Sequence, residues 1–309
     1  MFENFDAYLL PLQPFGITLI ALACIWLTQI FLVEFLYRRV IYPSMRKNRI
    51  TSFFISWVAV ASHELLGHFA VGAATGSQID DIELSSSSGH VISRYEVSVF
   101  GWFSQAISSF APCFAPTLLL LAIYYFAFPN QLLLPTSSFQ QILLSQTTNI
   151  QNFAYSLTDL FNPFSLLLLY LIMPLSLTAA SSTVDLKGFL SSIVRHPLIF
   201  LSFFIISLII YASLLAFGIN PSYAVFWFVT LSFALVLLGN LLSLALAILV
   251  ELTTRTSLLP TLLALLSFPS SYYYARMSLL FTPSNSFILA LSSTALLLFF
   301  FTLAFPRRR

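Results

Sequence analysis

The sequence predicts an all-α polytopic membrane protein, a bundle of six to eight transmembrane helices with a small β-hairpin after the second span. Hydrophobic residue types make up 59% of the 309 residues and charged types 8%, whereas soluble domains carry about 25% charged residues. Eleven acidic and thirteen basic residues are too few to cover a water-facing surface of this size. The composition excludes a soluble globule, a disordered chain and a nucleic-acid-binding protein. It indicates an integral, multi-pass protein of the cell membrane, in contact with lipid.

Seven apolar runs are predicted to span the membrane, and an eighth is ambiguous. A helix crosses about 30 Å of hydrocarbon in roughly 20 residues. The ambiguous run, 257–275, is interrupted by Pro260 and Pro269 and either crosses or lies flat. The first run follows an acidic head (Glu3 and Asp6) and is too long for the core of a signal peptide, so we expect it to remain as an anchor. The predicted spans are 16–37, 52–75, 99–127, 163–183, 197–217, 222–250 and 285–305.

Two segments between these runs differ from them in composition. Residues 79–99 contain charged side chains, a serine-rich turn signal and then alternation at period two, which predicts a β-hairpin. Residues 128–162 are rich in Gln, Asn, Ser and Thr and carry one charge, Asp159, so we predict a long interfacial loop. The alternating positions of the hairpin are Val91, Ser93, Tyr95, Val97 and Val99.

The basic residues give conflicting indications of orientation. Five of the thirteen lie between Arg38 and Arg49, and the positive-inside rule places them in the cytoplasm. The same rule places Lys187 and Arg195 there, yet three predicted spans separate the two groups. Because an odd number of crossings cannot satisfy both, either one of these spans does not cross or one basic group lies outside. The sequence leaves both possibilities open.

The strongest chemical signal is the hexapeptide His63-Glu64-Leu65-Leu66-Gly67-His68, in the middle of the second predicted span. Ionisable side chains are costly in a membrane interior unless they are paired or coordinated. Two histidines that flank a glutamate are the residue set of a zinc hydrolase, in which the histidines bind the ion and the glutamate is the general base. The alternative is a set of polar side chains packed against neighbouring helices.

The spacing of the histidines departs from the common zinc-protease motif. His-Glu-x-x-His places its histidines four apart, about 40° around a helix, whereas His63 and His68 are five apart, or about 140°. An undistorted α-helix would point them in different directions. A single π-type turn adds one residue locally and would return both rings to one face. Gly67 weakens the helix at this point and makes such a bulge easier.

A hydrolytic zinc site takes three protein ligands and a water, so a third ligand must come from elsewhere. We favour Asp185, at the end of an apolar run, where a helix can bring it to membrane depth. The alternative for Asp185 is an interfacial cap beside Lys187. Glu251 and Glu34 each precede an arginine by four residues, so a helix-surface ion pair is the simpler interpretation for both. The other candidates are Asp159, the hairpin acids, His90 and His196.

The resulting prediction is one zinc ion per chain, held by His63, His68 and Asp185. Glu64, adjacent to His63, is the predicted general base and the catalytic residue. Gln105 and Asn240 are amides within apolar runs. Each is a candidate donor to the oxyanion of the transition state, although an interhelical hydrogen bond is the simpler role for both.

The hexapeptide resembles the zinc motif of the dipeptidyl peptidase III family, in which both histidines bind zinc and the glutamate is the base. The wider arrangement, over roughly 52–190, resembles the site-2 protease family of intramembrane zinc metalloproteases. The likeness comprises a zinc motif within a span, a β-hairpin just after it, a further span, and an Asp-containing motif at the end of another. In that family the third ligand is the Asp of a Leu-Asp-Gly motif. The corresponding place here reads Asp185-Leu186-Lys187-Gly188.

The resemblance implies an anchor span and basic loop (1–50), a metalloprotease-like core (51–190) and C-terminal transmembrane helices (191–309). It implies hydrolysis of a peptide bond in a membrane-protein or peptide substrate, which the hairpin holds extended by β-augmentation. The hairpin is alternatively a plain connection. A non-catalytic relative that binds a membrane partner is the alternative function. A transporter is disfavoured because no chain of buried ionisable groups accompanies the motif.

Overall fold

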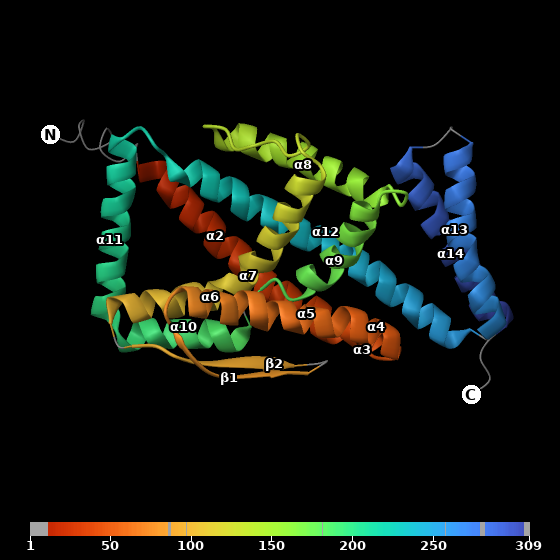
Figure 1. Cartoon of the computed structure of the whole chain (residues 1–309), viewed down its shortest axis with the longest axis horizontal. Helices are drawn as coiled ribbons and strands as arrows, with labels where there is room; N and C mark the ends of the chain where they lie inside the picture. The colour runs from red at the N-terminus through yellow and green to blue at the C-terminus, as the bar shows by residue number, and fades with distance from the viewer. Residues whose placement is uncertain are drawn as a thin grey trace.

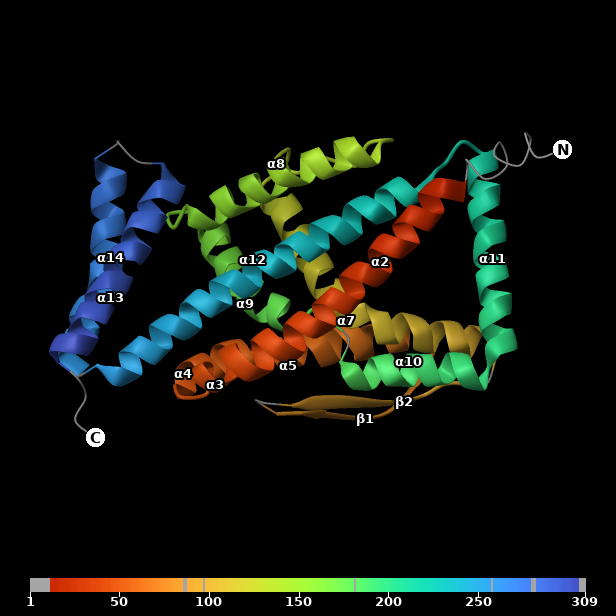
Figure 2. The same ribbon diagram turned by 180° about the vertical axis from the view of Figure 1, so that it is seen from behind.

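The computed structural model describes residues 12–85, 88–96, 98–180, 182–256, 258–278 and 282–305 (Figures 1 and 2). These residues form helices and one two-stranded antiparallel sheet. Six of the described helices are long and apolar enough to cross a membrane, or up to seven if the bent pair of α8 and α9 is one span. The predicted helical architecture is thus present, and its apolar helices are compatible with a multi-pass membrane protein.

In chain order the elements are α2 (Gln13–Leu32), η2 (Val33–Ile41), α3 (Tyr42–Met45), α4 (Arg49–Thr51), η3 (Ser52–Trp57), α5 (Val58–Ala61), η4 (Ser62–Phe69), α6 (Ala70–Ala74), β1 (Gln78–Leu84), β2 (Gly89–Arg94), α7 (Val99–Ala127), α8 (Phe139–Thr158), α9 (Pro163–Leu177), α10 (Thr183–Arg195), α11 (Pro197–Ala216), α12 (Pro221–Arg255), α13 (Leu258–Met277) and α14 (Pro283–Ala304). The three η elements are π-helices, and they join the α-helices around them into two long rods, Gln13–Met45 and Arg49–Ala74.

Several helices begin at a polar residue followed by proline. The side chains of Asn162, Asn220 and Thr282 each accept a hydrogen bond from a backbone N–H of the first turn that follows. Proline as the next residue has its φ already set for a helix and has no N–H that would need a partner. This local chemistry fixes where α9, α12 and α14 begin.

The prediction of a long loop over 128–162 was wrong, because 139–158 forms the helix α8. Polar side chains of α8 bond to neighbouring backbone instead of to water: Asn149 pairs with both the N–H and the carbonyl of Leu133, and Gln146 donates to the carbonyl of Trp227. The following helix, α9, has 15 residues and is shorter than the predicted span. It forms an angle of 114° with α8.

The predicted hairpin is present, in a shorter form. Strands β1 and β2 pair antiparallel with Glu83 opposite His90, and a bulge interrupts the register between Ile79 and Asp81. The prediction extended the strand to residue 99, but β2 ends at Arg94. The serines at the turn tip (86 and 87), residue 97, the acidic head and the three C-terminal arginines lie outside the described residues.

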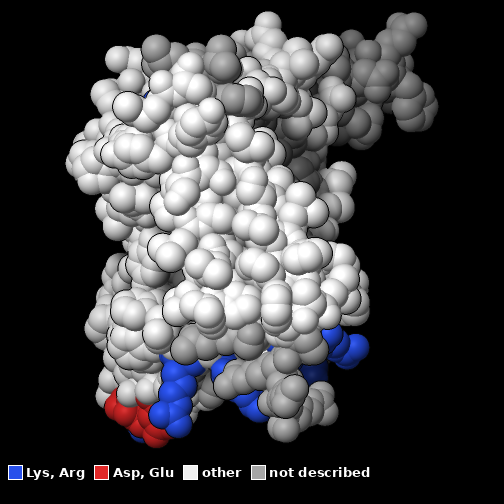
Figure 3. Space-filling model, turned by 90° about the vertical axis from the view of Figure 1, so that its right-hand side faces the viewer, with Lys and Arg blue, Asp and Glu red and all other residues white. Residues whose placement is uncertain are grey.

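The two groups of basic residues lie at one end of the molecule. We name this the basic end; α3, α4, α10, the hairpin and the C-terminal end of α12 form it, whereas α8 lies at the far end (Figure 1). In Figure 3, Lys and Arg gather at the lower end of the face shown, with Asp and Glu beside them, and most of the face above is uncharged. The elements at this end, with the turn between α3 and α4, carry Arg46, Lys47, Arg49, Arg94, Lys187, Arg195 and Arg255.

The course of the Arg49–Ala74 rod bears on the conflict over orientation. In Figures 1 and 2 this rod runs along the basic end, beside α10, instead of from one end to the other. The chain then leaves the basic end through α7 and returns through α9. Of the three predicted spans between the basic groups, therefore, the one that carries the hexapeptide does not connect the two ends. The two basic groups thus lie at the same end, an arrangement that the positive-inside rule allows in a membrane.

Buried apolar side chains pack against one side of this rod. One cluster joins the two rods to α9 and α12 and includes Ile41, Ile55, Leu177 and Ala247. A second joins α7, α8, α9 and α12 and includes Tyr124, Phe153, Ile172 and Leu235. The helix with the hexapeptide is thus packed on one side, and its other side faces α10 and the hairpin (Figure 1).

Candidate functional site

The hexapeptide lies in a π-helix, as its spacing predicts. The π-helix η4 spans Ser62–Phe69, and it places the rings of His63 and His68 with their centroids 5.1 Å apart and their planes at 74°. The wider turn offsets the five-residue spacing, because the i→i+5 hydrogen bonds of a π-helix bring residues that are five apart closer to one face than an α-helix does. Both imidazoles therefore lie on the same face of the helix.

Gly67 has a further role that the sequence did not indicate. A Cβ atom at this position would lie 2.7 Å from Cγ of Pro112 in α7, closer than real side chains approach. The absence of a side chain lets α7 pack directly against the widened turn. Gly67 thus serves both the helix distortion and the close contact behind it.

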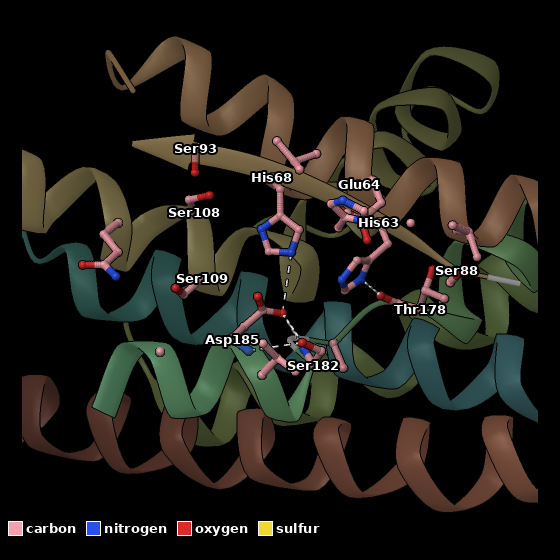
Figure 4. A pocket seen from close by; sticks show the side chains of 18 of the residues that line it. His63, Glu64, His68, Ser88, Ser93, Ser108, Ser109, Thr178, Ser182 and Asp185 are labelled. Carbon is pink, nitrogen blue, oxygen red and sulfur yellow. Dashed lines mark hydrogen bonds and ion pairs between the residues drawn. The ribbon is translucent and has the colours of Figure 1, made fainter. Parts of the chain in front are cut away.

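Asp185 reaches the histidines from α10. Its Oδ2 lies 3.5 Å from Nε2 of His68, and their side chains are 19% and 15% exposed (Figure 4). Asp185 also forms a capping box with Ser182: Oδ2 accepts from the backbone N–H and from the hydroxyl of Ser182, both at 2.7 Å. Burial alone would raise the pKa of the Asp185 carboxyl, but the hydrogen bonds from His68 and Ser182 outweigh it and lower that pKa to about 2.

The two interpretations of Asp185 that the sequence left open are thus compatible. The residue caps α10, with Ser182 as its partner instead of the predicted Lys187, and it also faces His68. Its second oxygen, Oδ1, has no hydrogen bond in the described part of the chain. The cap fixes the carboxylate and leaves one oxygen for a ligand.

A backbone carbonyl sets the orientation of His63. Nδ1 of His63 lies 2.9 Å from the carbonyl oxygen of Thr178, which follows α9, and Figure 4 shows the ring pointing toward it. The hydroxyl of Thr178 donates to the carbonyl of Ala59 at 2.7 Å, which ties that segment to the rod. When Nδ1 carries the proton and donates it to a carbonyl, Nε2 has its lone pair available, as in a metal-binding histidine.

The geometry of the three side chains fits a metal ion. Each of His63, His68 and Asp185 offers a ligand atom, and these atoms lie within 4.8 Å of one another. Two imidazoles and a carboxylate match zinc, which prefers nitrogen and oxygen donors in this number. Among the described residues this is the one such group.

The other ligand candidates lie elsewhere or have other partners. Glu251 bonds Lys47 and Arg255, and the hairpin acids Asp80 and Glu83 face Arg94 and His90. Asp159 lies at the junction of α8 and α9 and His196 at that of α10 and α11, and neither belongs to the group. The side chain of Glu34 is outside the described part of the structure.

Glu64, the predicted general base, is buried between its own helix and the hairpin. It is 7% exposed, and a Cβ on Gly89 of β2 would lie 2.6 Å from its Cγ atom. The hairpin therefore packs directly on this side chain, which only a glycine at position 89 permits. No local pattern in the sequence indicates this contact, because a glycine after a run of serines is equally typical of a turn.

A cavity of about 830 Å³ opens onto the cluster. His63, Glu64 and His68 line one side of it, strand β2 and α10 line others, and η2 contributes Arg38. Tyr37, Arg38 and Tyr42 also line the cavity, although the sequence predicts only the end of a span and a basic loop at these positions. Gln105 also lines the cavity, and it accepts a hydrogen bond from Ser192 of α10. Asn240 bonds the carbonyls of Ser176 and Val236 instead, the predicted interhelical role.

The cluster is thus a cavity-lining group of two imidazoles and a carboxylate, with a buried glutamate beside it, at the basic end of a mainly apolar helical chain. Comparison of the chain with protein-family models, curated proteins and solved structures gave no match. The function must therefore be argued from the geometry of this site.

Proposed function

We propose that this chain is a membrane-embedded zinc metalloprotease, similar to the site-2 proteases, that hydrolyses a peptide bond of a membrane-associated protein. The observation that carries the proposal is the π-helix η4, which brings His63 and His68 to one face opposite Asp185. A regular α-helix would separate the two rings by about 140°. π-Helices are rare, and their turns are frequently found at functional sites.

The residues of the site have separate roles in hydrolysis. His63, His68 and Asp185 would hold a zinc ion, and Thr178 and Ser182 would fix two of these ligands from behind. A bound zinc ion supplies a Lewis acid that activates water and polarises a carbonyl near neutral pH. Glu64 takes a proton from the attacking water and passes it to the leaving amine. Its burial beside the cavity keeps bulk water from competing for that proton.

The hairpin provides a surface for an extended substrate. In the two-stranded sheet, one edge of β2 has no strand beside it, and residues of β2 line the cavity from Gly89 to Ser93. A peptide bond within a helix is shielded by its own turns, so a substrate must unwind before it can be cut. Pairing with the edge of β2 would hold the unwound segment next to Glu64.

The direct test combines zinc analysis with cleavage. We expect about one zinc per purified wild-type chain, and background zinc for His63→Ala and His68→Ala. The variant Glu64→Gln should retain zinc and lose at least a hundredfold in cleavage rate, because it keeps the ligands and removes the base. Cleavage is measured as new peptide N-termini in a membrane fraction incubated with each protein. Background zinc in the wild-type protein contradicts the proposal.

The contact between the hairpin and Glu64 provides a second test of the proposed mechanism. Gly89→Ala adds a methyl group that must displace Glu64 or the hairpin. We expect at least a tenfold lower cleavage rate with zinc retained. Gly16→Ala is the matched control, because a Cβ at that position has nothing within 4 Å. Equal rates for both variants would remove the hairpin from the mechanism.

The alternative is a non-catalytic relative that binds a membrane partner. It is favoured by the observation that the cap on α10 already satisfies Oδ2 of Asp185 without any ion. If Glu64→Gln restores the phenotype of a deletion strain as well as the wild type does, this alternative replaces the protease.

A further inference from the structure

A second cavity adjoins the one at the histidine cluster. It has a volume of about 410 Å³, and Tyr95, Gln105 and Gly188 line both cavities, so the two meet at these residues. The second cavity lies between the start of α7, the C-terminal half of α10 and the start of α11. It extends the space along which a substrate on β2 would pass, away from Glu64.

Two exposed side chains of opposite charge line the second cavity. Arg195, in the last turn of α10, and Glu96, in the loop after β2, both line it and are both exposed. Neither side chain has an ion pair or a hydrogen bond in the described part of the chain. His196 lines the cavity as well.

Gln105 and Arg195 both offer hydrogen-bond donors at this place. The amide oxygen of Gln105 accepts from the hydroxyl of Ser192 at 3.0 Å, which leaves the amide NH₂ group to donate. The guanidinium of Arg195 offers a planar fork of donors that matches a carboxylate. Glu96 is the one carboxylate among the residues that line this cavity. A ligand rich in acceptors therefore suits the cavity better than a cation.

We propose that the second cavity is a substrate subsite for a carboxylate, from an acidic side chain or from the C-terminus of the substrate. Arg195 is the principal partner, Gln105 donates a further hydrogen bond, and Glu96 opposes binding. The inference rests on the proposed protease function and adds a substrate preference to it.

The course of β2 sets the distance between the scissile bond and the carboxylate of the substrate. The strand begins at Gly89, beside Glu64, and the chain then reaches Tyr95, which lines both cavities. An extended chain advances about 3.3 Å per residue, so a peptide that follows this course covers about 20 Å in six residues. The carboxylate is therefore expected roughly three to six residues from the bond that is cut.

The test measures peptide binding to the full-length Glu64→Gln protein in detergent, loaded with zinc, so that cleavage does not interfere. The probe is an uncharged ten-residue apolar peptide in which one position at a time is Glu or Gln, each made with a free and with an amidated C-terminus. We expect Glu at one position, or the free C-terminus, to bind about fivefold tighter than its uncharged counterpart, as for an exposed ion pair. The two series distinguish a side-chain carboxylate from a terminal one.

Three substitutions in this background are expected to change the preference for a carboxylate in different ways. Arg195→Gln should abolish the fivefold preference, and Glu96→Gln should increase it, because the opposing charge is gone. Lys187→Gln is the matched control: the residue is exposed on the same helix, carries the same charge and lines neither cavity, so the preference should persist.

Equal affinity for the Glu and Gln peptides would overturn the subsite, and so would a lack of binding of either peptide. The subsite would also be overturned if Lys187→Gln lost the fivefold preference as completely as Arg195→Gln. None of these results alters the zinc content or the cleavage rate of the wild-type protein, which test the proposed function separately.

Discussion

Asp185 and Glu251 have similar places in the sequence but different neighbours in the structure. Each lies at an end of an apolar run, and each is a candidate third ligand from the sequence. Glu251 bonds Lys47 through Oε2 and Arg255 through Oε1, the latter at 2.9 Å. Asp185 instead faces His68, and its other partner is Ser182, the cap of its own helix.

The solvent exposure of the two side chains does not explain the difference. The side chains of Asp185 and Glu251 are 19% and 24% exposed, which is nearly the same. The difference lies in charge: two cations already neutralise Glu251, whereas Asp185 has no lysine or arginine ion pair among the described residues. A carboxylate with two cationic partners gains little from a metal ion, and one opposite two imidazoles gains much. The neighbours of a carboxylate decide between an ion pair and a ligand.

The largest expected effect comes from removing each of these two carboxylates in turn and measuring zinc affinity. Asp185→Ala removes one of three ligands, so we expect at least a hundredfold loss of zinc affinity, measured by competition with a chelator. Glu251→Ala removes an equally exposed carboxylate and should leave zinc affinity unchanged. If both variants lose zinc to the same extent, the effect is on folding and not on coordination, and the comparison fails.

The local part of the site could be predicted from the sequence. The five-residue spacing of His63 and His68, together with Gly67, required a widened turn, and η4 confirms it. This worked because backbone geometry within one helix depends on residues close in sequence. The capping box of Asp185 had a local signal too, a serine three residues before an aspartate, which was not used as a cap signature.

The long-range part could not be predicted, because no local pattern encodes it. The packing of Gly89 on Glu64 and the place of Arg38 in the cavity depend on how separate elements meet. The loop predicted over 128–162 failed for the same reason: Asn149 of α8 finds its partner in the backbone of Leu133, a contact that polar composition alone does not reveal.

A smaller effect is expected from the residue that holds Asp185 in place. Ser182→Ala removes a hydroxyl that both donates to Asp185 and accepts from its backbone N–H. We expect about a tenfold loss of zinc affinity, as for other residues that orient a ligand. We also expect the free energy of unfolding to fall by about 1 kcal/mol, because the N-cap is lost. Thr282→Ala removes the cap of α14, remote from the cluster, and is the control. It should lower stability by a similar amount with zinc affinity unchanged, and a zinc loss in that variant would contradict the positioning role.

The smallest expected effect concerns the ion pairs of Glu251. Lys47 is half exposed and Arg255 more so, and exposed ion pairs contribute about 0.2–1 kcal/mol each. Glu251→Gln should therefore cost about 1 kcal/mol or less of unfolding free energy, and added salt should reduce the difference because it screens exposed charges. A double-mutant cycle with Lys47→Met, measured by thermal unfolding in detergent, isolates that pair. A coupling energy well above this range would show that Glu251 holds α12 to the turn between α3 and α4 as strongly as a buried contact does. In that case the contrast with Asp185 would lie in the strength of the two carboxylates' partners and not only in their charge.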